Sequence, residues 1–193
     1  MNFSFLFLYY KVFINKVINI MKKISLIVLS IFMCVSLFAK TYTISQKGID
    51  FIKQYEKCRL TAYSDNGGWT IGWGHHGKDV YEGMKITQKE ADKLFKEDIK
   101  AFEKIINRLL SALPYEYEFS QGFIDGFISF CYTCGEGSVK KSLFYERLMK
   151  CRVIDGVMDE SDFNFTVATI KTSKISAPGL VKRRYEEHKM MLT

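Results

Sequence analysis

Apolar residues recur at helical spacing through much of the chain after residue 40. The clearest stretch is Ala91–Leu110, where apolar side chains lie three or four positions apart. Thr87 and Glu90 stand before it with the spacing of a capping box, which predicts a long helix over about residues 87–110. Ser45 is a good N-cap for a shorter helix over residues 46–57.

The region between these two predicted helices has the pattern of a β-hairpin. Residues 60–64 and 69–74 form two short strand-like segments around the turn Asp65-Asn66-Gly67-Gly68. Ser120 can cap a further helix that ends near Gly135. Three more helices are predicted over residues 141–150, 160–165 and 179–192. The pattern therefore predicts an α+β domain that is mostly helical, with one small sheet near its N-terminus.

Residues 1–39 differ from the rest of the chain because they contain no acidic residue. Met21-Lys22-Lys23 is a basic start, residues 24–38 are apolar apart from serines and Cys34, and Ala39 is a small residue before Lys40. This layout predicts a secretory signal. An apolar run of about 15 residues is short for the roughly 20 that span a bilayer, which favours cleavage over an uncleaved anchor. Because Met21 begins a complete signal, either Met1 or Met21 can be the true start.

Composition and charge place residues 40–193 among ordinary globular domains. The chain is 48% hydrophobic and 25% charged, and its formal net charge is +7. Without the four lysines of residues 1–39 the net charge falls to +3. This charge is too small to indicate nucleic-acid binding, and no basic stripe with interleaved aromatic residues is present. One domain over residues 40–193 is long enough to bury a stable core.

An acidic residue ends the apolar face of the helix predicted over residues 46–57. Helical geometry places Ile49, Ile52 and Glu56 on one face. Burial and the negative end of the helix dipole both favour the protonated form of the Glu56 carboxyl group. That is the form that a general acid requires. Taken alone, a glutamate at a helix end is more often solvated or paired with a cation.

A second carboxylate and a hydroxyl follow within the predicted hairpin. Asp65 lies nine positions after Glu56, and Thr70 is on the adjacent strand. A hairpin packed against the helix end can hold Asp65 opposite Glu56, with Thr70 hydrogen-bonded to a water between them. Taken by itself, Asp65 is more often explained by a simple Asx turn.

These residues resemble a known family. The run Glu56-Lys57-Cys58-Arg59-Leu60-Thr61-Ala62-Tyr63-Ser64-Asp65, followed by Trp69-Thr70-Ile71-Gly72-Trp73-Gly74-His75, is similar to the signature of the phage-type lysozymes, glycoside hydrolase family 24. Residues 121–137 are similar to the family's central helix, and residues 179–187 to its C-terminal helix. The resemblance covers roughly residues 44–192 and implies a lysozyme-like fold, with the hairpin flanking an active-site cleft.

The resemblance implies hydrolysis of the β-1,4 bond between N-acetylmuramic acid and N-acetylglucosamine in the glycan strands of bacterial peptidoglycan. Glu56 would be the acid, Asp65 would act on the attacking water, and Thr70 would help to place that water, with inversion of configuration. No metal or organic cofactor is expected. A monomer exported to the periplasm or cell wall is expected, touching the membrane only through residues 1–39, either briefly or as a tether before release.

One departure from the family concerns the hairpin. The family usually has five residues between the positions of Asp65 and Thr70, whereas here there are four, residues 66–69. A shorter tip makes the placement of Asp65 less secure than that of Glu56 or Thr70. Two alternatives stay open, a lytic transglycosylase, which needs no water-activating carboxylate, and a catalytically silent protein that binds peptidoglycan.

Three further residues have a supporting role in this interpretation. His75 matches a family histidine that is mainly structural. Either Arg183 or Arg184 could neutralise acidic groups in the site. Only one of them can point there, because adjacent residues of a helix face different directions. His76 and His188 do not have zinc-ligand spacing with the cysteines.

The cysteines of the domain allow several arrangements. Cys131 and Cys134 have the spacing of a redox pair, but they lie at a predicted helix end, which favours a buried or disulfide-bonded role. Together with Cys58 and Cys151 they allow three pairings outside the cytosol. Cys58 is two residues from Glu56, so a disulfide there could control activity.

Overall fold

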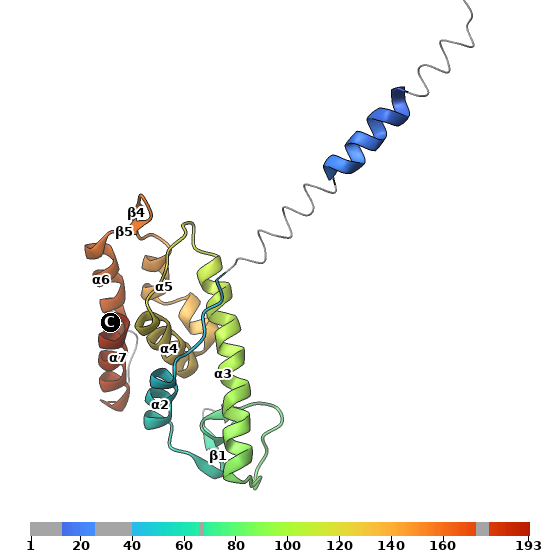
Figure 1. Cartoon of the computed structure of the whole chain (residues 1–193). Coiled ribbons are helices and arrows are strands. Elements are labelled where there is room, and N and C mark those ends of the chain that lie inside the picture. The colour runs from blue at the N-terminus through green and yellow to red at the C-terminus, as the bar shows by residue number, and fades with distance from the viewer. Residues whose placement is uncertain (1–12, 26–39, 66–67, 173–177) are drawn as a thin grey trace, which may run out of the picture. The chain divides into compact units, whose positions relative to one another are not determined.

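The computed structural model describes residues 13–25, 40–65, 68–172 and 178–193 (Figure 1). The chain divides into two units, Met1–Thr41 and Tyr42–Thr193. Residues 13–25 of the first unit are helical, whereas most of the apolar run of the predicted signal lies outside the described residues. Within the described part of the chain, no helix is long and apolar enough to cross a membrane. Export through residues 1–39 thus stays a prediction.

The second unit is mostly helical. Its helices are α2 (Gln46–Tyr55), α3 (Gln88–Ser111), α4 (Gln121–Lys140), α5 (Leu143–Leu148), α6 (Glu160–Ala168), the 3₁₀ helix η1 (Thr169–Thr172) and α7 (Pro178–Met191). Its strands are β1 (Arg59–Asp65), β2 (Gly68–Gly72), β3 (His75–His76), β4 (Val153–Ile154) and β5 (Val157–Met158). Each predicted helix is present, in the predicted order, which confirms the α+β class.

The helices begin where the sequence places their caps. The hydroxyl groups of Ser45 and Ser120 accept hydrogen bonds from backbone N–H groups in the first turns of α2 and α4. Thr87 and Glu90 form the predicted capping box of α3. The helical backbone of α4 breaks at Gly135, where the sequence predicted the end of the helix, and a second helical segment then continues to Lys140. Gly135 has φ 73° and ψ 156°, a conformation that favours glycine.

The predicted hairpin has a third strand that the sequence analysis missed. In the antiparallel sheet the order is β1-β2-β3, so β2 is the central strand. Thr70 of β2 stands opposite Tyr63 of β1 and opposite His76 of β3. A two-residue strand is too short to show alternation in the sequence. Its pairing nevertheless fixes which side chains lie beside Thr70.

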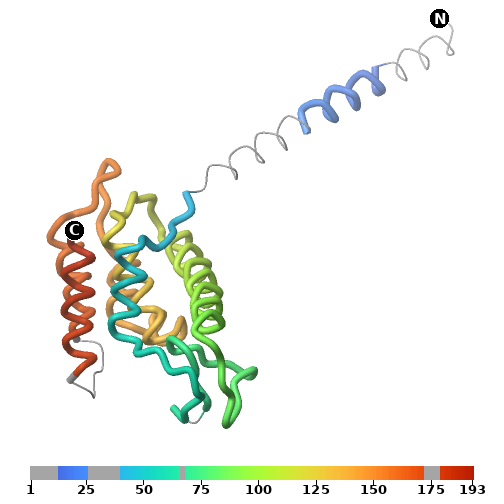
Figure 2. The backbone as a smooth tube through the Cα atoms, turned by 60° about the horizontal axis from the view of Figure 1, so that its bottom comes forward, coloured from blue at the N-terminus to red at the C-terminus, as the bar shows by residue number. Residues whose placement is uncertain are grey.

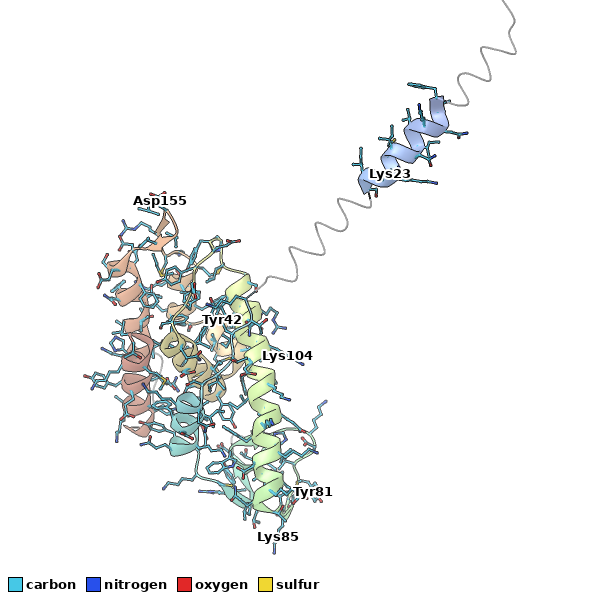
Figure 3. All side chains as sticks on the ribbon, viewed as in Figure 1. Lys23, Tyr42, Tyr81, Lys85, Lys104 and Asp155 are labelled. Atoms are coloured by element: carbon cyan, nitrogen blue, oxygen red, sulfur yellow. The ribbon has the colours of Figure 1, made fainter. Side chains whose placement is uncertain are left out.

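A second hairpin, formed by β4 and β5, was also missed. Asp155 and Gly156 both have positive φ between its strands, at 52° and 76°. An Asp-Gly pair between short apolar segments is a recognised hairpin signal, so the sequence contained the information. Asp155 lies at the opposite end of the domain from Tyr81 and Lys85, which follow the first sheet (Figure 3).

The hydrophobic core is centred on α4, which packs against α2, α3 and α7. Aromatic rings dominate it: Phe127 lies 5.8 Å from Phe123 and 5.1 Å from Phe144, between ring centroids. Figures 1 and 2 show α3 running along the domain, with the first sheet at one of its ends. In this arrangement the first sheet and α7 lie around the C-terminal end of α2, where Glu56 is located.

Candidate active site

Glu56 terminates α2. Its backbone N–H donates to the carbonyl of Ile52 at 3.0 Å, and its own φ and ψ of −89° and 95° are extended, so it is the C-cap. The predicted helix over residues 46–57 is therefore two residues too long. Ile52 is fully buried, while the Glu56 side chain keeps 23% of its surface exposed. The apolar face thus ends in a carboxyl group, as the pattern predicted, but this group is less buried than the sequence analysis assumed.

One oxygen of the Glu56 carboxyl group is held by an arginine of α7. Nη1 of Arg183 donates to Oε1 of Glu56 at 2.6 Å, and the Arg183 side chain is only 3% exposed. A nearly buried, planar donor at this distance fixes the position of the carboxyl group. This contact joins residues that are far apart in the sequence, so spacing did not reveal it. Of the adjacent pair, Arg183 is the residue that meets Glu56.

The other carboxyl oxygen lies beside Gly74. Gly74 has φ +97°, and a Cβ atom built there would stand 3.1 Å from Oε2 of Glu56. A side chain at this position would be strained in its backbone and would press on the carboxyl group. Gly74 therefore keeps Oε2 accessible, a role that its place in the family signature did not reveal.

Asp65 is the last residue of β1 and is exposed. Its Cα is paired with that of Gly68 in β2. Tyr63 stands two residues earlier, on the same face of the strand. Burial raises the pKa of Tyr63, and the charges of Asp65 and Glu56 raise it further. The two carboxylates thus lie within Coulombic range of one phenol, which is consistent with a shared site.

Thr70 is buried in the central strand of the first sheet. Its side chain is 4% exposed, and its Oγ1 atom lies 3.3 Å from Nδ1 of His76. The ring of His76 also covers the backbone of Gly68, where a Cβ atom would stand 2.3 Å from Cε1 of the ring. His76, considered above only as a metal ligand, therefore contacts both the proposed water-placing hydroxyl and the residue opposite Asp65.

The side chain of His75 lies between the first sheet and two carboxylates that follow it in the sequence. Its Nδ1 atom lies 2.9 Å from both carboxylate oxygens of Asp98 in α3, and its Nε2 atom lies 3.1 Å from Asp79. The hydrogen bond to Asp98 is the main reason that the pKa of His75 rises to about 9; burial opposes this rise, and Asp79 adds to it. His75 links the sheet to α3.

Arg184, the second of the adjacent arginines, points into the core instead. Its guanidinium lies 4.8 Å from the centroid of the Phe130 ring and donates to Glu187. Arg184 is 2% exposed and Glu187 is fully buried. Glu187 lies on the same helical face as Arg183 and Arg184, four and three residues after them, but this spacing is equally common for exposed ion pairs and does not reveal its burial.

The described cysteines, Cys58, Cys131, Cys134 and Cys151, are not in disulfide bonds. Cys131 is buried, and burial raises the pKa of its thiol to about 12, as expected for an inert core cysteine. Cys58 accepts a long 3.7 Å contact from Gln88. Among the described residues, no cluster of three or more metal-binding side chains is found.

Known proteins resemble this chain in sequence and in structure. The Phage lysozyme family model matches residues 53–187. The endolysin of Bacillus phage B103 is 32% identical over 78% of this chain and 54% of its own length, so the chain spans about half of that relative. The endolysin of Acyrthosiphon pisum secondary endosymbiont phage 1 is 31% identical over 75% of this chain and 94% of its own length. A P22 lysozyme mutant shares the fold, with a TM-score of 0.60, 28% identity, and coverage of 79% of this chain and 99% of that one.

Proposed function

Because the chain belongs to the phage lysozyme family, we propose that it is a muramidase that cuts the β-1,4 bond between N-acetylmuramic acid and N-acetylglucosamine in peptidoglycan. The observation that carries this proposal is the environment of Glu56. One carboxyl oxygen is fixed by Arg183, while the other lies beside Gly74, which has no side chain to cover it.

In the proposed mechanism Glu56 protonates the glycosidic oxygen. Since Oε1 is occupied by Arg183, Oε2 is the atom that carries the donated proton. As the leaving group departs with this proton, Glu56 becomes a carboxylate and Arg183 stabilises the new charge. A general acid of this kind contributes about 10²–10⁴-fold to the rate.

Water attacks the anomeric carbon from the opposite face of the sugar. Asp65 accepts a proton from this water. A hydrogen bond with the hydroxyl group of Thr70 orients the water so that its lone pair points at the anomeric carbon. This arrangement requires a gap of about 6.5–9.5 Å between the two carboxyl groups and gives inversion of configuration. The reaction is acid–base chemistry and uses no cofactor. The proposed substrate is the glycan strand, reached after export directed by residues 1–39.

The test is digestion of isolated peptidoglycan by the full chain, with mass analysis of the products. Products with a reducing sugar end are expected. Anhydro ends would instead identify a lytic transglycosylase, and binding without digestion would identify a silent wall-binding protein. A Glu56→Gln chain that digests peptidoglycan at the wild-type rate would contradict the proposed mechanism.

A further inference from the structure

Helix α7 contains three charged side chains that are almost completely removed from water. Arg183, Arg184 and Glu187 are 3%, 2% and 0% exposed. Removing an ion from water costs several kcal/mol even after relaxation, so such groups are normally balanced by close partners. Only Arg183 contacts Glu56, and the mechanism proposed above leaves Glu187 and Arg184 unused.

Each of the three nitrogens of the Arg183 guanidinium group donates a hydrogen bond. Nη1 donates to Oε1 of Glu56 at 2.6 Å, Nε donates to Oε1 of Glu187 at 3.2 Å, and Nη2 donates to Oγ of Ser129 at 3.2 Å. The Ser129 hydroxyl in turn donates to Oε1 of Glu187 at 2.6 Å. Glu187 and Ser129 together fix the plane of the guanidinium, so that its remaining edge is directed at Glu56.

The four ionisable groups form a row of alternating charge. Glu56 meets Arg183, Arg183 meets Glu187, and Glu187 meets Arg184. Burial raises the pKa of Glu187, and the two arginines oppose this rise. The row is neutral overall when every member is ionised.

We propose that Glu187 is a positioning residue for Glu56, and that Arg184 is the counter-charge that completes its effect. Glu187 acts through Arg183: it holds the guanidinium in place and offsets part of its positive charge. This role rests on the proposed function, in which Glu56 is the acid, and it assigns no contact with substrate to Glu187 itself.

The row predicts opposite effects for two changes of charge. Without the negative charge of Glu187, two buried guanidinium groups act on Glu56, which then holds its proton less tightly. Without the positive charge of Arg184, two carboxylates share Arg183, so Glu56 holds its proton more tightly. Tyr63 of β1 and Tyr132 of α4 also lie in Coulombic range of Glu56, but both phenols are neutral over the pH range concerned because burial raises the pKa of each. The neighbouring Lys57 is exposed.

The experiment compares Glu187→Gln and Arg184→Met in the full chain. Two quantities are measured: the titration midpoint of the Glu56 carboxyl group by carbon NMR, and the basic limb of the pH–rate profile on isolated peptidoglycan. The midpoint and the limb are expected to move to lower pH in Glu187→Gln and to higher pH in Arg184→Met. A shift of about half a pH unit or more is expected, since a direct neighbouring charge shifts a titration by about 1–3 units.

Two controls separate this role from a merely structural one. Arg184→Lys keeps the charge and is expected to leave the midpoint in place. Lys182→Met removes one positive charge from the same helix, but its side chain is 72% exposed, so solvent screening is expected to prevent a shift. The double variant Glu187→Gln/Arg184→Met restores the charge balance and is expected to titrate near the wild-type midpoint; it also serves where a single variant does not fold.

The proposal is overturned by a midpoint that stays fixed in both single variants, by shifts in the same direction, or by a double variant displaced as far as either single one. Loss of activity in both variants with no shift would leave Glu187 with a structural role alone. The NMR titration does not depend on catalysis. If the wild-type chain failed to digest peptidoglycan, the proposed function would fail while the coupling of Glu187 to Glu56 was still measured.

Discussion

The two sides of the proposed active site are built in opposite ways. Glu56 ends a helix that packs on the core, and its partner Arg183 is 3% exposed and tied to the fully buried Glu187. Asp65 is the last residue of β1 and is exposed, with Gly68 as its cross-strand neighbour. The acid side is thus determined by buried charge pairs, whereas the water side depends on a short hairpin.

This difference follows from what each proposed step requires. A proton donor must keep one carboxyl oxygen available at a fixed place, and a buried guanidinium provides that restraint because its geometry is planar and directional. The water side must admit a solvent molecule, so it cannot be closed in the same way. Substitutions on the acid side are therefore expected to change activity and stability together, and substitutions at the hairpin tip to change activity alone.

The largest effect is expected for Glu56→Gln. The amide retains the shape and can still accept the hydrogen bond from Arg183, but it has no proton to donate, so activity on isolated cell walls should fall about 10²–10⁴-fold. The loss of turbidity of a wall suspension measures this, and circular dichroism checks the fold. Glu97→Gln, at an exposed position on α3, is the matched control and should retain full activity. Equal losses in the two variants would argue against a special role for Glu56.

A large loss of stability is expected for Arg183→Met. This change leaves Glu56 and Glu187 without their shared partner, and breaking a buried ion pair from one side costs about 3–5 kcal/mol in the free energy of unfolding. Urea unfolding followed by tryptophan fluorescence measures the change. Arg152→Met is the control, because Arg152 also bridges two carboxylates, Asp159 and Asp162, but lies at the surface. If both variants lost the same free energy of unfolding, the burial of Arg183 would not explain its contribution to stability.

A pH-dependent effect is expected at His75, which ties the sheet to α3. Its pKa is about 9 in the folded protein and about 6.5 when unfolded, so the protonated ring stabilises the fold fully below about pH 6.5. This contribution, on the order of 3 kcal/mol, is lost as the pH rises through about 9. The free energy of unfolding of His75→Gln should therefore approach that of the wild type as the pH increases. His188→Gln is expected to show the opposite trend, because burial lowers the pKa of His188. A His75 effect that grew with pH would contradict the ion pairs with Asp98 and Asp79.

The sequence predicted the elements better than it predicted the contacts between them. Caps and apolar spacing placed α2, α3 and α4, because these signals are local, whereas the 3₁₀ helix η1 was not predicted. The partner of Glu56 lies 127 residues away, and spacing alone could reduce the choice only to Arg183 or Arg184. Glu187 gave no signal, since a buried glutamate has the same letter as a solvated one. His76 could not be found from strand alternation, because the strand β3 has only two residues.

The smallest effect, and the one that bears most directly on the weaker side of the site, concerns the length of the hairpin. Inserting one glycine between Asn66 and Gly67 restores the five residues that phage-type lysozymes have between the positions of Asp65 and Thr70. Since Asp65 is exposed at the very end of β1, we expect the longer tip to let it approach the attacking water more closely.

Turnover on isolated walls is then expected to rise a few-fold, and Asp65→Asn should cost more activity in the extended hairpin than in the native one. Comparison of the four chains, with and without the insertion and with Asp or Asn at position 65, measures the coupling between tip length and Asp65. Thr70→Val in both backgrounds is the control, because Thr70 is buried in the central strand and its contribution should not depend on the tip. If Asp65→Asn costs the same activity with either hairpin, the shorter tip already places Asp65 correctly. The two sides of the site would then differ in how deeply their residues are buried, and not in how precisely they are placed.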